Sequence, residues 1–135
     1  MTENKARTFG FGMPWESQYG YSQAVRAGDT LYISGQVSHD EDGTFIGAGD
    51  FGLQVKTTLA NLDRVLDHFG ATRNQIVETT VLVSDLRANF DTAARLHAAY
   101  MGDWRPTSTV MEVTALALPD QLVEIGALVR LDLPK

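Results

Sequence analysis

The most regular hydrophobic pattern in the chain runs from residue 51 to residue 69. Its apolar residues recur at spacings of three and four: Phe51, Val55, Leu59, Leu62, Leu66 and Phe69. This spacing places them on one face of a helix. Gly70 follows directly, as glycine often does where a helix ends. The pattern therefore predicts a helix with one buried face over this segment.

Short runs of β-branched or alternating residues predict the strands. There are five such runs, at 21–25, 30–37, 76–83, 107–115 and 122–131. Gly28 and Asp29 favour a hairpin turn between the first two runs, and Pro119 and Asp120 favour a turn between the last two. A second helix is predicted to begin at Asn89 or shortly before. Its inner face is expected to carry Phe90, Ala94, His97 and Met101.

The element order is thus β-β-α-β-α-β-β. It predicts the α+β class, with a single-layer mixed sheet and both helices on one face. Residues 1–19 are rich in glycine and aromatic residues, and we expect them to form an irregular or edge segment. The chain has 135 residues, which predicts one domain over residues 1–135.

The last predicted strand indicates what each face of the sheet meets. One set of residues alternates cleanly and should face the helices: Val123, Ile125, Ala127, Val129 and Leu131. The other set mixes leucines with a carboxylate and a guanidinium: Leu122, Glu124, Gly126, Leu128 and Arg130. A semi-apolar face with no helices to cover it favours contact with another subunit. We therefore expect a closed homo-oligomer with a pocket at the subunit junction.

Composition narrows the classes of function. The 11 basic and 17 acidic residues give a net charge of −6, which argues against nucleic acid or an anionic membrane as the main partner. The chain has no cysteine, which excludes disulfides, thiolate metal sites and cysteine nucleophiles. No apolar run of about 18 residues and no secretory signal is visible, so a cytoplasmic protein is expected. The three histidines lack metal-binding spacing, and no metal site is predicted.

One run carries a specific resemblance. Residues 21–36, YSQAVRAGDTLYISGQ, resemble the opening hairpin of the reactive intermediate deaminase (Rid, or YjgF-like) family. The likeness continues through 61–62, 65–66, 77–83 and 123–125, and covers the chain from about Gly20 to Leu131. The resemblance implies a chorismate-mutase-like fold and a homotrimer with clefts between neighbouring subunits.

The resemblance also implies a chemistry. Members of the family hydrolyse enamines and imines to a keto product and ammonia, without a metal or cofactor, at the cleft between subunits. Glu124 matches the glutamate that holds the attacking water. Tyr21 matches the tyrosine at the cleft, and Ser34 matches the small residue at the strand end. These three residues are the candidate catalytic residues.

The candidate substrate-binding residues depart from the family pattern. Ser108 occupies the position of the arginine that binds the substrate carboxylate, with Thr109 beside it. Val110 falls where many members have cysteine, and Ala94 where some have asparagine. One hydroxyl does not replace a bidentate guanidinium. The chain thus resembles a divergent member whose substrate is not the usual amino-acid-derived one, unless Arg105 brings a displaced guanidinium into the cleft.

Other interpretations stay open from the sequence. Glu124 can be a strand carboxylate that is paired with Arg130 or exposed at an edge. Trp15 and Trp104 can line an apolar pocket or simply pack. The whole protein can be a non-catalytic trimer that binds a small molecule or holds client proteins. Ribonuclease activity, attached to some members of the family, is disfavoured by the acidic charge.

Overall fold

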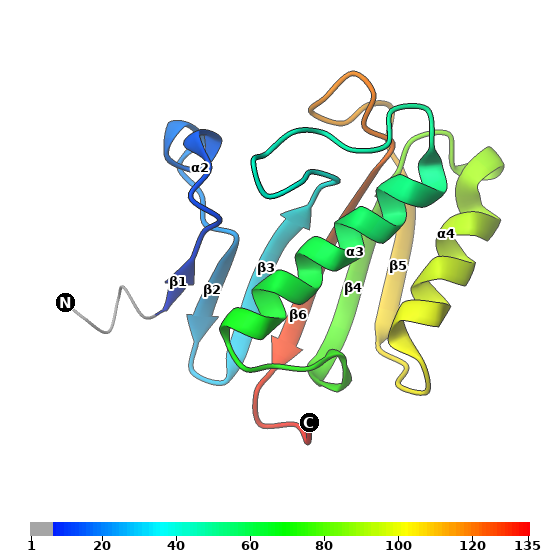
Figure 1. Cartoon of the computed structure of the whole chain (residues 1–135). Coiled ribbons are helices and arrows are strands. Elements are labelled where there is room, and N and C mark those ends of the chain that lie inside the picture. Colours follow the sequence, from blue (N-terminus) through cyan, green and yellow to red (C-terminus); the bar gives the residue numbers. More distant parts are fainter. Residues whose placement is uncertain (1–6) are drawn as a thin grey trace.

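The core of the protein is a six-stranded mixed sheet crossed on one face by two long helices (Figure 1). The computed structural model describes residues 7–135. In spatial order the strands are β1 (Thr8–Phe9), β2 (Ala24–Ala27), β3 (Thr30–Gln36), β6 (Val123–Arg130), β4 (Ile76–Val83) and β5 (Thr107–Glu112). Neighbouring strands are antiparallel except β4 and β5, which are parallel. This arrangement confirms the α+β class.

The predicted first helix is confirmed as α3 (Phe51–His68). Asp50 caps its start by accepting a hydrogen bond from the backbone N–H of Leu53. The apolar stripe is buried against the sheet, with Val55, Leu62 and Val65 at 1 % exposure or less. A short 3-10 turn, η1 (Arg73–Gln75), then leads into β4. The period of three and four residues therefore located both the helix and its buried face.

The alternation predicted for the last strand is also confirmed. Val123, Ile125 and Val129 of β6 are buried beneath the helices. Both long helices lie on this one face of the sheet, as Figure 1 shows. Glu124 and Leu128 point to the opposite face, which no helix covers in the part of the chain that the structure describes. That open face carries the first part of the candidate site.

Two of the five predicted strands have wrong boundaries, whereas the other three agree with the structure to within one residue at each end. The first strand of the hairpin is β2, Ala24–Ala27, rather than 21–25, because Ala27 pairs directly with Thr30 across the two-residue turn. β5 ends at Glu112 rather than at residue 115. Its partner β4 ends at Val83, so the chain beyond has no strand to pair with.

The expectation of an irregular N-terminal segment is wrong for part of its length. Residues 14–19 form a short helix, α2 (Pro14–Tyr19), which begins with a proline at its first turn and buries no residue. β1 does lie at the edge of the sheet, as expected. Residues 1–6 of the predicted segment lie outside the described residues.

The second helix is α4 (Leu86–Met101), and its predicted inner face is partly wrong. Phe90 is 49 % exposed, whereas the buried residues are Ala93, Tyr100 and Met101. Figure 1 shows α4 beside α3 near the β5 edge of the sheet. α4 therefore turns its buried stripe toward both α3 and β4, which rotates the inner face away from Phe90.

Candidate functional site

Glu124 projects from β6 onto the open face of the sheet. β6 lies between β3 and β4, and Glu124 is directly opposite Leu82 of β4. The carboxylate lines a hollow of about 410 Å³. Strands β3, β4 and β6 supply its walls, with Tyr32, Gly35, Thr80, Leu82 and Leu128 among the lining residues. The hollow thus combines two acidic residues, Glu124 and Glu78 of β4, with apolar and hydroxyl-bearing walls.

The electrostatic setting of Glu124 favours its protonated form. Burial raises the pKa of this carboxyl group, and a weak hydrogen bond from Gln121, 3.5 Å from its Oε1, opposes that rise. Arg130 instead binds Asp132 at 2.8 Å and donates to Thr30. None of the ion pairs between residues 7 and 135 includes Glu124. The alternative that pairs Glu124 with Arg130 is therefore wrong.

Gly35 leaves the space that the Glu124 carboxyl group occupies. A Cβ atom at residue 35 would lie 2.6 Å from Cδ of Glu124, closer than real Cβ atoms approach. β3 has an irregular register with β6 between Ile33 and Gln36, so this glycine sits where the ladder is interrupted. The backbone of β3 therefore forms one side of the carboxylate's surroundings.

Tyr21 and Ser34 line a second hollow, of about 690 Å³, between β3 and the N-terminal segment. Ser34 Oγ donates to the carbonyl of Ser22 at 2.7 Å. Burial raises the pKa of Tyr21, and the charges of Glu16 and Glu124 raise it further. Tyr21 is therefore within electrostatic reach of Glu124 and remains a neutral hydrogen-bond donor at neutral pH.

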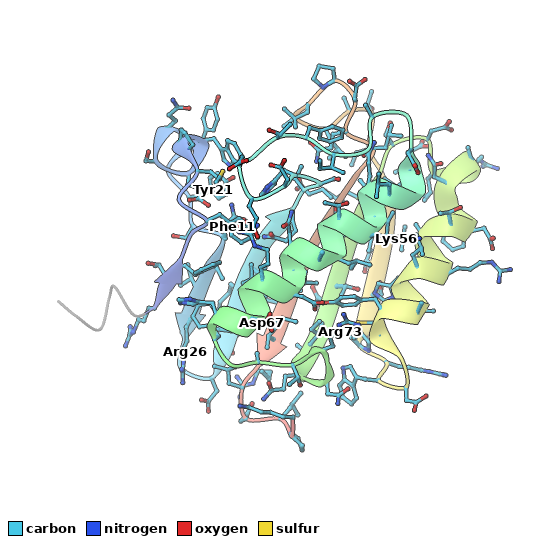
Figure 2. The ribbon with its side chains drawn as sticks, in the orientation of Figure 1. Phe11, Tyr21, Arg26, Lys56, Asp67 and Arg73 are labelled. Carbon is cyan, nitrogen blue, oxygen red and sulfur yellow. The ribbon has the colours of Figure 1, made fainter. Side chains whose placement is uncertain are left out.

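Glu16 of α2 holds the segment that carries Tyr21, and no pattern in the sequence indicates this role. Its carboxylate accepts hydrogen bonds from the backbone N–H groups of Phe11, Gly12 and Met13 at 2.8–3.1 Å. It also accepts one from Gln23 Nε2 at 2.9 Å. Figure 2 labels Phe11 and Tyr21, which belong to the segments that precede and follow α2. Glu16 thus ties this segment to the start of β2.

Ser108 lies on the helix-covered face of the sheet and ends a chain of polar side chains. Its Oγ is 2.9 Å from Oγ1 of Thr79, the residue opposite it on β4. Oγ1 of Thr79 is 2.8 Å from Nε2 of His97 on α4. Burial lowers the pKa of this histidine. Within one chain, Ser108 and Glu124 therefore lie on opposite faces of the sheet.

The other candidate substrate-binding residues lie on β5, on α4 and in the loop between them. Thr109 is exposed on β5, opposite Thr80 in the ladder. Val110 is half-buried against the core, and Ala94 is half-buried on α4. Arg105 is exposed in the loop before β5. The structure thus brings Tyr21 and Ser34 together in a single hollow, and places Glu124 in a separate one.

Both tryptophans pack rather than line either hollow. Trp104 packs on the core and donates through Nε1 to the carbonyl of Ile76 at 2.6 Å. Trp15 meets the ring of His39 edge to face at 5.7 Å. Among residues 7–135, no three His, Asp or Glu side chains gather where they could share a metal ion. None of the described helices has the length and apolar character that a bilayer crossing requires.

Comparison with known proteins identifies the family. The family model described as Endoribonuclease L-PSP matches residues 14–131, and the chain belongs to this family, also called YjgF, RutC or Rid. A Pyrococcus abyssi RutC family protein is 32 % identical over 80 % of this chain and 84 % of its own length. The mouse 2-iminobutanoate/2-iminopropanoate deaminase is 35 % identical over 80 % of this chain and 78 % of its own.

Solved structures agree with this assignment. A Mycobacterium tuberculosis member of the YjgF/YER057c/UK114 family superposes with a TM-score of 0.81 at 31 % identity, covering 91 % of this chain and 97 % of the other. A Yersinia pestis Rid family protein gives 0.76 at 32 % identity, covering 82 % and 86 %. These matches confirm the predicted chorismate-mutase-like fold. The family includes proteins named as imine deaminases.

Proposed function

We propose that this protein hydrolyses an imine or enamine to a ketone and ammonia, with Glu124 handling the attacking water. The observation that supports this most is the setting of Glu124. Its carboxyl group is half-buried, has a raised pKa and takes part in none of the ion pairs of the described residues. Carboxyl groups shifted in this way by burial are suited to general acid–base catalysis.

The reaction needs only water as a second reactant. The carboxylate of Glu124 accepts one proton from water as the water oxygen bonds to the imine carbon, and returns this proton to the nitrogen, which gives a neutral carbinolamine. The same carboxylate then accepts the proton of the carbinolamine hydroxyl group and delivers it to the nitrogen as the C–N bond breaks. Ammonia leaves, and the carbon retains the oxygen as a carbonyl. One carboxyl group whose pKa is raised by burial performs each of these transfers. Tyr21 and Ser34 would orient the substrate by hydrogen bonds.

Uncharged imines are the proposed substrate class. Ser108 stands at the family's arginine position and is linked to the neutral side chains of Thr79 and His97. A substrate carboxylate that bound at Ser108 would lose hydrating water and gain one hydrogen bond from a hydroxyl group. Such binding is unfavourable for a charged group. Arg105 is exposed in the adjacent loop. The result expected for this chain is turnover of uncharged imines ahead of imino acids.

The proposed assembly is a homotrimer in which a neighbouring subunit covers the open face. The hollow around Glu124 is semi-apolar, and Tyr32 in its lining is 53 % exposed. Both observations support the proposal that this face is buried on assembly. Such a cover would also exclude water and strengthen the effect of burial on Glu124. Sedimentation velocity measures the oligomeric state, and a monomer at micromolar concentration would contradict this assembly.

The experiment that tests the proposed function compares ammonia release from freshly generated imines. The panel pairs carboxylated imines with uncharged ones of similar size. Turnover of the uncharged imines is the expected result. Faster turnover of imino acids would indicate that a cation, Arg105 first, binds the carboxylate. Binding of the ketone products without turnover of any imine would favour the non-catalytic alternative, a trimer that binds a small molecule or a client protein.

A further inference from the structure

The hydrogen-bonded chain from Ser108 to His97 joins three separate elements. Ser108 lies on β5, Thr79 on β4 and His97 on α4, and the two links measure 2.9 and 2.8 Å. Thr79 is 1 % exposed, His97 is half-buried and Ser108 is exposed. The chain therefore runs from the interior to the surface and ends there on a hydroxyl group.

The exposed end of this chain can offer either a donor or an acceptor. If Nε2 of His97 carries no hydrogen, Thr79 donates to it and Ser108 donates to Thr79. The outward side of Ser108 Oγ is then an acceptor. If Nε2 carries the hydrogen, each hydroxyl donates in the opposite direction and Ser108 donates outward. The tautomer of the buried ring thus sets the polarity of the exposed hydroxyl.

The three side chains of this hydrogen-bonded chain are also electrically neutral. Burial lowers the pKa of His97 from its ordinary value of 6.5, which leaves the imidazole uncharged at neutral pH. Thr79 and Ser108 carry no charge. A bound neutral hydroxyl or carbonyl keeps its hydrogen bonds at such a site, whereas a carboxylate loses hydration without gaining a cation.

From these observations we infer that Ser108, oriented through Thr79 by His97, is a specificity-determining position that binds an uncharged hydroxyl or carbonyl group of the ligand. This inference builds on the proposed hydrolysis of uncharged imines. It adds that the favoured imine carries a second, neutral hydrogen-bonding group. Because Ser108 and Glu124 of one chain lie on opposite faces of the sheet, one imine would meet both residue types only where two subunits of the proposed trimer join. Ser108 would touch the ligand there. Thr79 and His97 would be positioning residues that act through it.

The test uses stable ketone products, so it does not depend on turnover. Hydroxyacetone and butanone have the same number of heavy atoms and differ in a neutral hydroxyl group, and pyruvate carries a carboxylate. Each is titrated into the whole protein by NMR, and the ring signals of His97 are identified from their absence in His97→Gln. Hydroxyacetone is expected to shift these signals and to bind about two- to tenfold more tightly than butanone. Pyruvate is expected to bind more weakly than hydroxyacetone.

The variants distinguish a ligand-binding role of these hydrogen bonds from a purely structural role. Ser108→Ala, at an exposed position, should abolish the preference for hydroxyacetone. Thr79→Val should also abolish the preference, because valine keeps the shape of the side chain but removes the hydrogen bonds between Ser108 and His97. Thr79→Ser keeps a hydroxyl group and should retain the preference. Thr107→Val, which removes a hydroxyl that β5 presents on the other face, is the matched control and should also retain it.

Two results would overturn the inference. One is a preference for hydroxyacetone that survives in Ser108→Ala, and the other is tighter binding of pyruvate than of hydroxyacetone by the wild-type protein. If the protein binds hydroxyacetone through Ser108 but hydrolyses no imine, the ligand site at Ser108 stands and only the proposed reaction is refuted. The two failures are therefore distinguishable.

Discussion

The carboxyl group of Glu124 occupies the space that a side chain at Gly35 would fill. A Cβ atom at residue 35 would lie 2.6 Å from Cδ of Glu124. The two residues come from neighbouring strands, β3 and β6. The absence of a side chain at one residue thus determines where the proposed catalytic group of the other can lie.

Gly35→Ala is expected to displace the Glu124 carboxyl group and to lower kcat by about 10- to 100-fold, since small misplacements of catalytic groups have effects of this size. Steady-state kinetics with an uncharged imine measure the loss, and circular dichroism confirms the fold. Gly52→Ala is the matched control, because a Cβ there meets nothing closer than 3.9 Å and alanine favours a helix. Equal kcat values for the two variants would contradict the steric argument.

Glu124→Gln should leave stability at pH 7 equal to or higher than that of the wild type. Burial raises the pKa of Glu124 above 4.5, so the folded state binds its proton more tightly than the unfolded state. The contribution of this group to the free energy of unfolding therefore falls as pH rises from about 4.5 through the folded pKa, and stays low above it. Below pH 4.5 the two proteins should converge.

Thermal unfolding of both proteins between pH 3.5 and 8 measures this difference. A variant that is less stable than the wild type at pH 7, with the gap closing in acid, would mean that the carboxylate is stabilised in the fold. Burial would then not destabilise the ionised form of Glu124.

Tyr100→Phe is expected to cost about 1–3 kcal/mol of unfolding free energy. The Tyr100 hydroxyl donates to Asp63 at 2.6 Å, and Arg73 binds the same carboxylate while lying over the tyrosine ring. These contacts join α3, α4 and η1. The change removes a hydrogen bond to a charged group that is largely out of water.

Chemical denaturation measures the cost of Tyr100→Phe. Arg95→Met, which breaks an exposed pair with Asp91, is the control and should leave the free energy of unfolding nearly unchanged, because exposed ion pairs contribute little. A Tyr100→Phe variant no less stable than this control would show that the buried hydroxyl contributes nothing.

Glu16→Gln should loosen the segment that carries Tyr21 while leaving the core intact. The amide offers one acceptor oxygen where the carboxylate now accepts from three backbone N–H groups and Gln23. Hydrogen exchange in residues 9–21 is expected to rise at least tenfold, the effect of about 1.4 kcal/mol of local opening. Glu41→Gln changes an exposed acidic residue and serves as the control. Unchanged exchange in Glu16→Gln would contradict the assigned role.

The features that the sequence predicted are those carried by local periodicity. The stripe of α3 and the alternation of β6 repeat every few residues, so burial followed from spacing alone. The short helix α2 has no buried residue and depends on Pro14 and the hydrogen bonds of Glu16, which periodicity does not register. The predicted burial of Phe90 is wrong because the rotation of α4 depends on its packing at the edge of the sheet, which the helical period does not determine.

The candidate site was predictable only in part. Resemblance to the family pointed to Glu124, and the structure places it in a hollow with no ion-pair partner among the described residues. The link from Ser108 to His97 was not predictable, because it depends on the register of β5 against β4 and on the rotation of α4. These residues are 11 to 29 positions apart in the chain, and no short-range pattern connects them.

The most direct test of the central claim is kcat for ammonia release from an uncharged imine, compared between wild type and Glu124→Gln, with Glu41→Gln as control. If Glu124 handles the water, kcat should fall by about 10²- to 10⁴-fold in a variant that stays folded with unchanged oligomeric state, and should be unaltered in the control. Wild-type kcat in folded Glu124→Gln would contradict the account.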